Sequence, residues 1–399
     1  MSTARIFMST ARNYLAREIY RSTLVVMLAL MGLFSFFTLV DQLDAVNDRF
    51  PLSALFYIEA LALPTRLYDL LPIGLLIGSI VALAGLAQRN ELVILRVSGV
   101  GSIRLLGMLW AIAIPVMALA VVLSEVVTPA AEIRYSEANM VMRGKVQGGR
   151  LVSGYWFKEP TESGGSRVIN VGKLLSSGEV ADVFIYQFDA NESLSFLRQA
   201  KRGTFEGGQM VLSEVTDTIV PDSAVGALTD GQRPTQALIT VRQEPEQLMQ
   251  TSLTPGRIAA KIATPERMSL LALWDYIGYL QSNQLDADRQ IVAVWRKLAY
   301  PFTLIVMLTI AAPISYMQTR AGGVGAKMFI GILVGTSFFM ISQLTLNVGT
   351  LYRWPPIVTA LLPSTIVFLL ALGTVLLMER RRGPKERRPT TRQAEKSTA

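Results

Sequence analysis

Six long apolar stretches without a single Asp, Glu, Lys or Arg are the feature that most limits what this 399-residue chain can fold into. Each is long enough, or nearly so, to cross a hydrocarbon core of about 30 Å as a helix. They divide three and three around one long polar insert: Ser22–Val40, Leu70–Ala87, Leu105–Leu123, Leu298–Met317, Met328–Leu346 and Ile357–Met378. The pattern predicts a polytopic α-helical membrane protein with six transmembrane helices, arranged 3 + 3.

Lysine and arginine in the short flanks predict which side of the membrane each loop faces. Basic residues precede the first span, occupy the 86–104 loop and fill the C-terminal tail, which holds eight basic and three acidic residues after Met378. We therefore expect both termini and the 86–104 loop in the cytoplasm, and the insert on the opposite side of the membrane. The tail accounts for much of the net charge of +8 as a solvated or lipid-associated end, so no nucleic acid is expected.

The insert changes to a β pattern. Segments such as "SRVINVG", "ADVFIYQFD" and "ALITVRQEP" are short, β-branched and partly alternating, and they are separated by Gly, Asn, Asp and Pro. We expect an antiparallel β-sandwich or jelly roll. The expected domains are an amphipathic cytoplasmic helix (1–21), three spans (22–125), the jelly roll (130–265), a helical linker with three more spans (266–378) and a basic tail (379–399).

The chain lacks the cysteine and histidine residues on which two common routes to enzyme activity depend. It contains no cysteine and no histidine, which excludes thiol chemistry, the usual zinc and haem sites and any Ser-His-Asp mechanism. No P-loop is present, since "NVGKLLSSG" and "MRGKVQGG" lack the upstream glycine and the following hydroxyl residue. We expect no catalytic residue, no metal and no cofactor, and any ATP hydrolysis would belong to a partner subunit.

The loop between the second and third spans mixes charged and apolar residues. "LAQRNELVILRVSGVGSIR" predicts a short amphipathic helix over 88–99. It is either a membrane-surface helix or a docking element whose apolar side chains fill a groove on a soluble ATPase. For the docking alternative the predicted coupling residues are Arg89, Glu91, Leu92 and Leu95.

Several motifs in order resemble the YjgP/YjgQ permeases, the inner-membrane subunits of the lipopolysaccharide export ABC transporter. They are "RNYLAREIYRS", "LVDQLD", "LAQRNELVILRVSGV", "YIGYLQSNQLDADRQIVAVWRKLAYP" and "YRWPPIVTALLPS". The motifs "VDQL" and "AQRNELV" and the "PP" before the last span favour the LptG branch over the LptF branch. The resemblance covers nearly the whole chain and is weakest within the insert.

The resemblance implies a permease subunit that extracts lipopolysaccharide from the outer leaflet of the inner membrane. Its implied partners are an LptF-like permease, a dimer of an LptB-like ATPase, and LptC-like and LptA-like bridge proteins of the periplasm. Lipid would enter a cavity between the two permeases, and ATP binding would squeeze it into the jelly roll. The family's coupling helix coincides with 88–99 and its acidic residue with Glu91.

Two alternatives to this assignment remain. One is the paralogous LptF-type subunit of the same complex. The other is a mechanotransmitting ABC subunit, which moves no lipid itself and usually has four spans. A secondary transporter is disfavoured because the spans show neither broken helices nor intramembrane charges.

Lipid head-group recognition is expected at the outer ends of the spans. The candidates are basic residues suited to phosphate, and Lys297 is favoured because it matches a lysine of the family: Arg66, Arg134, Arg143, Arg296 and Lys297. Interfacial snorkelling is the alternative role for each. Other lysines of the LptG relatives are replaced here by Thr38, Asp44, Ala45 and Thr65, so the head-group contacts carry over only loosely.

The jelly-roll interior is expected to receive the lipid. In "ADVFIYQFD" the inward positions are either Val183 and Ile185 or the alternate pair Phe184 and Tyr186.

Overall fold

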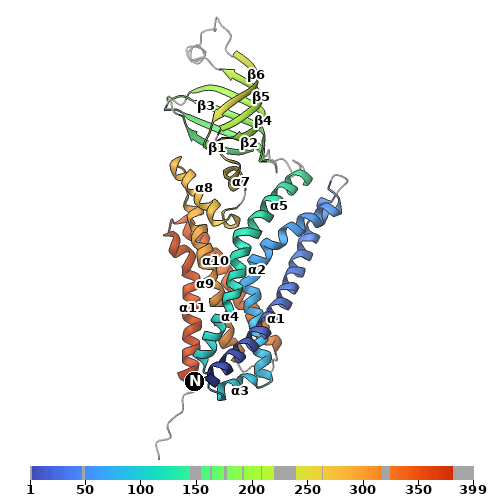
Figure 1. Ribbon diagram of the computed structural model, residues 1–399, viewed down its shortest axis with the longest axis vertical. Coiled ribbons are helices and arrows are strands. Elements are labelled where there is room, and N and C mark those ends of the chain that lie inside the picture. Colours follow the sequence, from blue (N-terminus) through green and yellow to red (C-terminus); the bar gives the residue numbers. More distant parts are fainter. Residues whose placement is uncertain are drawn as a thin grey trace, which may run out of the picture.

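The chain folds into a long helical bundle that carries a β-sheet domain at one end (Figure 1). This computed structural model describes residues 2–46, 50–143, 154–161, 164–174, 178–190, 193–207, 209–219, 240–262, 264–316 and 324–380. We call the two ends of the bundle the α3 end and the sheet end, after the elements that lie there.

Six helices of the described chain are long and apolar enough to cross a membrane, which confirms the 3 + 3 prediction. The helices that contain the spans are α1 (Ser2–Asp41), α2 (Leu52–Gln88), α4 (Ser102–Val122), α9 (Asp288–Tyr316), α10 (Val324–Leu351) and α11 (Pro356–Arg380). Two of them extend far beyond the predicted spans. The N-terminal arm is continuous with the first span in α1. Helix α2 begins at Leu52, whereas the predicted span begins only at Leu70, because a charge-free window excludes Glu59, Arg66 and Asp69.

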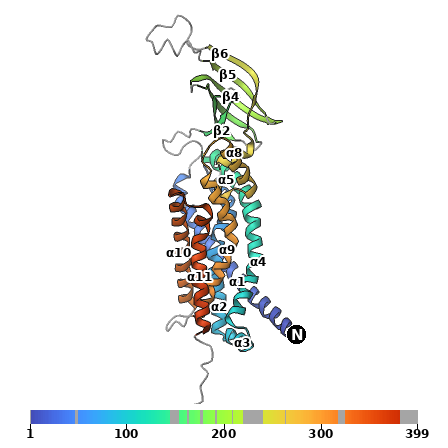
Figure 2. The same cartoon turned by 90° about the vertical axis from the view of Figure 1, so that its left-hand side faces the viewer.

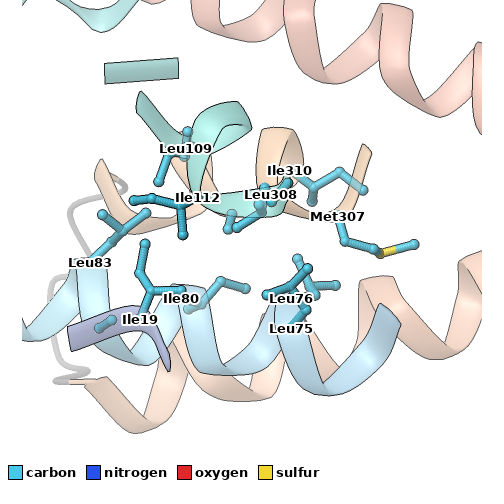
Figure 3. Close-up of a cluster of buried hydrophobic side chains, with 14 of the residues drawn as sticks. Ile19, Leu75, Leu76, Ile80, Leu83, Leu109, Ile112, Met307, Leu308 and Ile310 are labelled. Atoms are coloured by element: carbon cyan, nitrogen blue, oxygen red, sulfur yellow. The ribbon is translucent and has the colours of Figure 1, made fainter. Parts of the chain in front are cut away.

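The centre of the bundle is filled by large aliphatic side chains from α1, α2, α4 and α9 (Figure 3). The side chains most completely buried, at 0% exposure, include those of Ile19, Leu75, Leu76, Ile80 and Leu109. Helices α1 and α2 approach closely at Gly78, where a Cβ atom would lie 2.4 Å from the Cα atom of Thr23. Small residues permit such close backbone packing between membrane helices, so Gly78 fixes the α1–α2 contact.

The third span continues without a break towards the sheet. α4 passes through a π-helical turn (Leu123–Val127) into α5 (Thr128–Arg143). A π-helical turn inserts one extra residue into a helix and is often found at functional sites. This helix therefore runs through the whole bundle, from α3 (Glu91–Val97) at one end to the sheet end at the other.

The inserted β domain is one antiparallel sheet of six described strands. The strands are β1 (Tyr155–Pro160), β2 (Ser166–Leu174), β3 (Val180–Phe188), β4 (Leu194–Glu206), β5 (Gln209–Ile219) and β6 (Thr240–Gln250), and each pairs with the next along the chain. An inserted β domain is thus confirmed. The described strands follow one another across this single sheet in the order of the sequence.

Helices supply the second layer of this domain. α7 (Pro255–Ile262), a 3₁₀ turn (Pro265–Arg267) and α8 (Leu270–Ser282) follow β6 and lie between the sheet and the bundle. Leu273, Tyr276 and Tyr279 of α8 share a core with Val183 and Ile185 of the sheet. Because the helices complete this core, the sheet needs no second sheet to bury its apolar face. Figure 2 shows the same order from the side, with α8 directly beneath the strands.

Candidate functional site

At the α3 end, two tight turns isolate a helix of only two turns. Asn90 precedes α3 in the left-handed region with φ 59°, and Gly99 follows it with φ 94°. The backbone N–H of Val100 donates to the carbonyl of Leu95 across this second turn at 3.0 Å. Glycine adopts such a positive φ without strain, so the "SGVG" segment ends the helix where the sequence predicts.

A polar network fixes α3 to α1. The Tyr14 hydroxyl donates to Glu91 Oε2 at 2.7 Å, Arg89 Nη2 donates to Glu18 Oε1 at 2.9 Å, and Arg89 Nε lies 3.3 Å from Glu91 Oε1. Glu91 thus already has two partners within its own chain. The predicted coupling residues Arg89 and Glu91 lie side by side, and they join α3 to the N-terminal half of α1.

The apolar side chains of α3 divide between two faces. Leu92 is 4% exposed within the bundle core, and Leu95 packs against that core from a half-buried position. Val93, Ile94 and Val97 point outwards and are 55%, 63% and 84% exposed. The burial of Leu92 opposes its predicted docking role, whereas the role of half-buried Leu95 stays a prediction, and the most exposed apolar side chains of α3 are Val93, Ile94 and Val97. A helix of seven residues gives too short a periodicity to choose its face from sequence.

At the sheet end the bundle holds a polar cavity of about 440 Å³ between α2, α9, α10 and α11. Its lining includes four cationic side chains, those of Arg267, Arg289, Arg296 and Lys297, and two carboxylates, those of Asp69 and Glu266. Hydroxyl and amide groups such as those of Thr128, Ser342 and Gln343 also line it, and the hydroxyls of Thr128 and Ser342 are buried without a hydrogen-bond partner among the described residues. The cavity lining therefore combines cations, carboxylates and hydroxyl groups that can still form hydrogen bonds.

Lys297 lies in the wall of this cavity but is paired within the chain. Its Nζ atom donates to Glu125 Oε1 and to the Ser124 carbonyl, both at 3.1 Å, and its side chain is 5% exposed. The other carboxylate oxygen of Glu125 accepts the backbone N–H of Leu270 at 2.7 Å, at the start of α8. Glu125 belongs to the π-helical turn, so this turn, α9 and α8 meet at one carboxylate.

Among the other predicted head-group residues, two have acidic partners. Arg66 donates to both carboxylate oxygens of Glu59, whose side chain is 8% exposed, and to the Ser35 hydroxyl of α1. Arg296 Nη1 lies 3.9 Å from Glu266 Oε1 at the cavity wall. Arg66 thus serves α1–α2 packing away from the cavity lining, while Arg296 contributes to the cavity.

The remaining two candidates lie on α5. Arg134 is exposed, and Arg143 is the last residue of that helix, with its side chain outside the described part of the chain. Neither belongs to the described lining of the cavity.

A second carboxylate joins the linker to the bundle, and sequence analysis did not identify it. Glu132 of α5 accepts two hydrogen bonds from Arg267 Nη1 at 3.1 and 3.0 Å, and it lies 3.5 Å from the hydroxyl of buried Thr65. Glu125 and Glu132 are seven residues apart and both bind the segment just before or at the start of α8. That spacing on one helical face is the signal by which this pair could have been found.

In the β domain the two alternate residue pairs of β3 face opposite ways. Val183 and Ile185 are fully buried in the core shared with α8, whereas Phe184 and Tyr186 are half-buried on the other face, where Tyr186 stacks on Trp156 with ring centroids 5.7 Å apart. Val183 and Ile185 are thus the pair that faces the core between the sheet and α8. Burial also raises the pKa of the Tyr279 phenol, which stays neutral and donates to the Lys158 carbonyl at 3.2 Å.

These features define a class of protein: a multi-pass helical membrane protein with an inserted β domain, an exposed amphipathic helix at one end and a polar cavity at the other. The chain belongs to the family described as lipopolysaccharide export system permease LptF/LptG, whose model matches residues 13–378. This confirms the resemblance found in the sequence.

Curated relatives are similar to the chain over almost their whole length. The lipopolysaccharide export system permease protein LptG of Escherichia coli (strain K12) is 28% identical over 371 residues, which cover 91% of this chain and 97% of that protein. The protein of the same name from Haemophilus influenzae (strain ATCC 51907 / DSM 11121 / KW20 / Rd) is 24% identical over 378 residues, covering 93% and 99%.

Proposed function

We propose that this chain is the LptG-type permease subunit of an ABC transporter that extracts lipopolysaccharide from the outer leaflet of the inner membrane. A separate ATPase dimer binds at the α3 end, and a paralogous LptF-type permease completes the transmembrane part. The sheet end passes the lipid to a periplasmic bridge of further β domains. The LptG name of the relatives supports this assignment to one branch of the family.

The arrangement of the two ends is the observation that carries the proposal. Basic residues gather at the α3 end, namely Arg12, Arg17, Arg21, Arg89, Arg96 and Arg104. The positive-inside rule therefore puts α3 and both termini in the cytoplasm, where ATP is available, and the cavity and sheet at the periplasmic side. An ATP-driven device that lifts a lipid away from the cytoplasm needs this polarity.

The cytoplasmic end is suited to receive the stroke of an ATPase. The outward side chains of Val93, Ile94 and Val97 form a small apolar surface that a groove on a soluble partner would bury. The bonds of Glu91 and Arg89 to Tyr14 and Glu18 make α3 and the N-terminal half of α1 move together. Work applied to α3 reaches α4 directly, because only Ser98 to Gly101 separate the two helices.

The periplasmic end is suited to an anionic glycolipid. The cavity has four cationic and two acidic lining residues, and its hydroxyl and amide groups match a phosphorylated sugar. Helices α1 and α10 also present large apolar side chains to the outside, among them Leu24, Leu28, Phe329 and Leu333. These surfaces are available for acyl chains and for the paralogous permease.

The test follows the lipid and the ATPase together. A photocrosslinking amino acid at Phe339, in the cavity lining, is introduced into the tagged full chain, and the complex is captured from membranes. We expect an ATPase to copurify and lipopolysaccharide to crosslink, with the crosslinked amount falling when ATP is supplied. An ATPase that copurifies without any crosslinked lipid would instead favour a mechanotransmitting subunit that moves no lipid.

A further inference from the structure

Lys297 occupies two environments at once. It belongs to the lining of the polar cavity, and yet its ammonium group lies 3.1 Å from Glu125 and is almost fully buried. A lysine that served only to recognise an anion would point freely into the cavity, and one that served only packing would not line it. The Lys297 ammonium group is therefore paired with Glu125 in this structure, and it lies where an anion in the cavity could take the place of that carboxylate.

Glu125 connects this pair to α8, the helix that packs beneath the sheet. Its Oε2 atom accepts the Leu270 N–H at 2.7 Å, while its Oε1 atom accepts from Lys297 and from the Ser124 hydroxyl, the latter at 3.1 Å. Leu270 begins α8, and Leu273 and Tyr276 of that helix belong to the core beneath the sheet. Whatever changes the charge balance at Glu125 also acts on the start of α8.

We propose that Lys297 exchanges its counter-ion during transport: it leaves Glu125 for a phosphate of the entering glycolipid, and Glu125 then loosens its hold on α8. This inference rests on the proposed function. A phosphate carries at least the charge of a carboxylate and offers three acceptor oxygens, so it competes for the ammonium group. It also places a second negative charge beside Glu125, and like charges in a poorly screened site repel. Through this exchange, binding of the lipid in the cavity would change the contact of Glu125 with α8 and so affect the β domain above it.

The exchange predicts opposite effects from the two halves of one ion pair. In Glu125→Gln the ammonium group is released for phosphate, so the affinity for lipopolysaccharide should rise about three- to tenfold, a change of about 1 kcal/mol. In Lys297→Met the affinity for lipopolysaccharide should fall about tenfold, and the double variant should have the same affinity as Lys297→Met. A pair that only holds the helices together would give changes of the same sign in both single variants.

Binding is measured on the complex captured through the tagged full chain and reconstituted in nanodiscs, with intact and with dephosphorylated lipopolysaccharide. The variants should differ only for the intact lipid. Glu214→Gln is the matched control, because it removes the same charge from an exposed pair with Lys201 in the sheet. Lys297→Arg is the second variant should Lys297→Met fail to fold, and its binding should stay within about threefold of the parent.

The link to α8 is tested by distance measurement, which the absence of cysteine from the sequence makes simple. Spin labels are placed at exposed Glu206 in β4 and exposed Tyr352 beyond the end of α10. Lipopolysaccharide should shift the distance distribution in the parent chain and leave it unshifted in Lys297→Met.

The outcomes separate the exchange from the function on which it rests. If the parent complex binds no lipopolysaccharide, the proposed function fails. If it binds, but Glu125→Gln and Lys297→Met change the affinity in the same direction, or the distance shifts equally in Lys297→Met, the exchange alone is wrong.

Discussion

Both ends of the bundle join distant helices through carboxylates and cations, yet the two sets differ in burial. At the α3 end the side chains of Arg89, Glu18 and Glu91 are 51%, 29% and 29% exposed. At the sheet end one partner of each pair is more buried: Lys297 and Glu132 are 5% and 13% exposed, while their partners Glu125 and Arg267 are 25% and 38% exposed. Water screens the first set and competes for its hydrogen bonds, whereas each pair of the second set has one partner held away from water. Breaking a contact at the α3 end therefore costs less than breaking one at the sheet end, where a new partner must replace the lost one.

The largest effect on stability is expected from Glu125→Ala. It leaves the buried Lys297 ammonium group without a counter-ion and the Leu270 N–H without an acceptor. Removing one partner of a buried pair costs about 3 kcal/mol or more. Thermal unfolding in nanodiscs should show the loss, and Lys297→Met added to Glu125→Ala should recover part of it. An unchanged melting temperature in Glu125→Ala would mean that the sheet end is no more rigid than the α3 end.

A smaller loss is expected from Arg267→Gln. Glu132 would keep only the 3.5 Å contact with Thr65 in place of two hydrogen bonds from a guanidinium group that is itself 38% exposed. The partial exposure limits the cost to about 1–2 kcal/mol. Arg134→Gln, on the same α5 but exposed, is the control and should change the free energy of unfolding by less than about 0.5 kcal/mol. Equal losses in both variants would contradict the role of the Glu132–Arg267 bond.

At the α3 end, Tyr14→Phe should cost less than about 1 kcal/mol, since it removes one exposed hydrogen bond to Glu91. Arg89→Gln should act similarly, and its effect should shrink as salt is raised from about 0.05 to 0.5 M, because exposed ion pairs are screened. Hydrogen exchange of the α3 amides is the measurement. If the effect of Arg89→Gln did not depend on salt, the ion pairs at the α3 end would be as poorly screened by water as those at the sheet end.

The smallest effect on stability, and a large one on assembly, is expected from Ile94→Asp. The side chain is 63% exposed, so the free energy of unfolding should stay within about 0.5 kcal/mol of the parent. Copurification of the proposed ATPase should be lost, because the charge would enter an apolar groove. Leu351→Asp, equally apolar and exposed at the other end, should leave it intact. Normal ATPase capture by Ile94→Asp would contradict docking at this face.

The spans, the inserted β domain and the short helix after the second span could be predicted because each rests on a local pattern. Runs without charge identify membrane helices, and "SGVG" marks where α3 ends. The extension of α2 was missed because Glu59, Arg66 and Asp69 interrupt its hydrophobicity without interrupting the helix. Charge lowers the preference for lipid but does not break a helix.

The pairings could not be predicted, because they join residues far apart in sequence. Lys297 was predicted as a residue at the end of a span, and its partner Glu125 precedes it by 172 residues. The docking face of α3 is decided by how Leu92 fits the core formed by other helices. Residue type gives the chemistry of a side chain, and the tertiary structure decides whether its first partner lies inside or outside the chain.

The π-helical turn at Leu123–Val127 also acts as a phase shift in the third span. One extra residue rotates everything after it by about 100° relative to an uninterrupted α-helix. Glu132 accepts hydrogen bonds from Arg267 in the helical phase that follows this turn. Deleting a single residue within the turn would leave the composition and hydropathy of the span almost unchanged. It would, however, rotate α5 about its axis, so that the face that contacts Arg267 would point away from the linker.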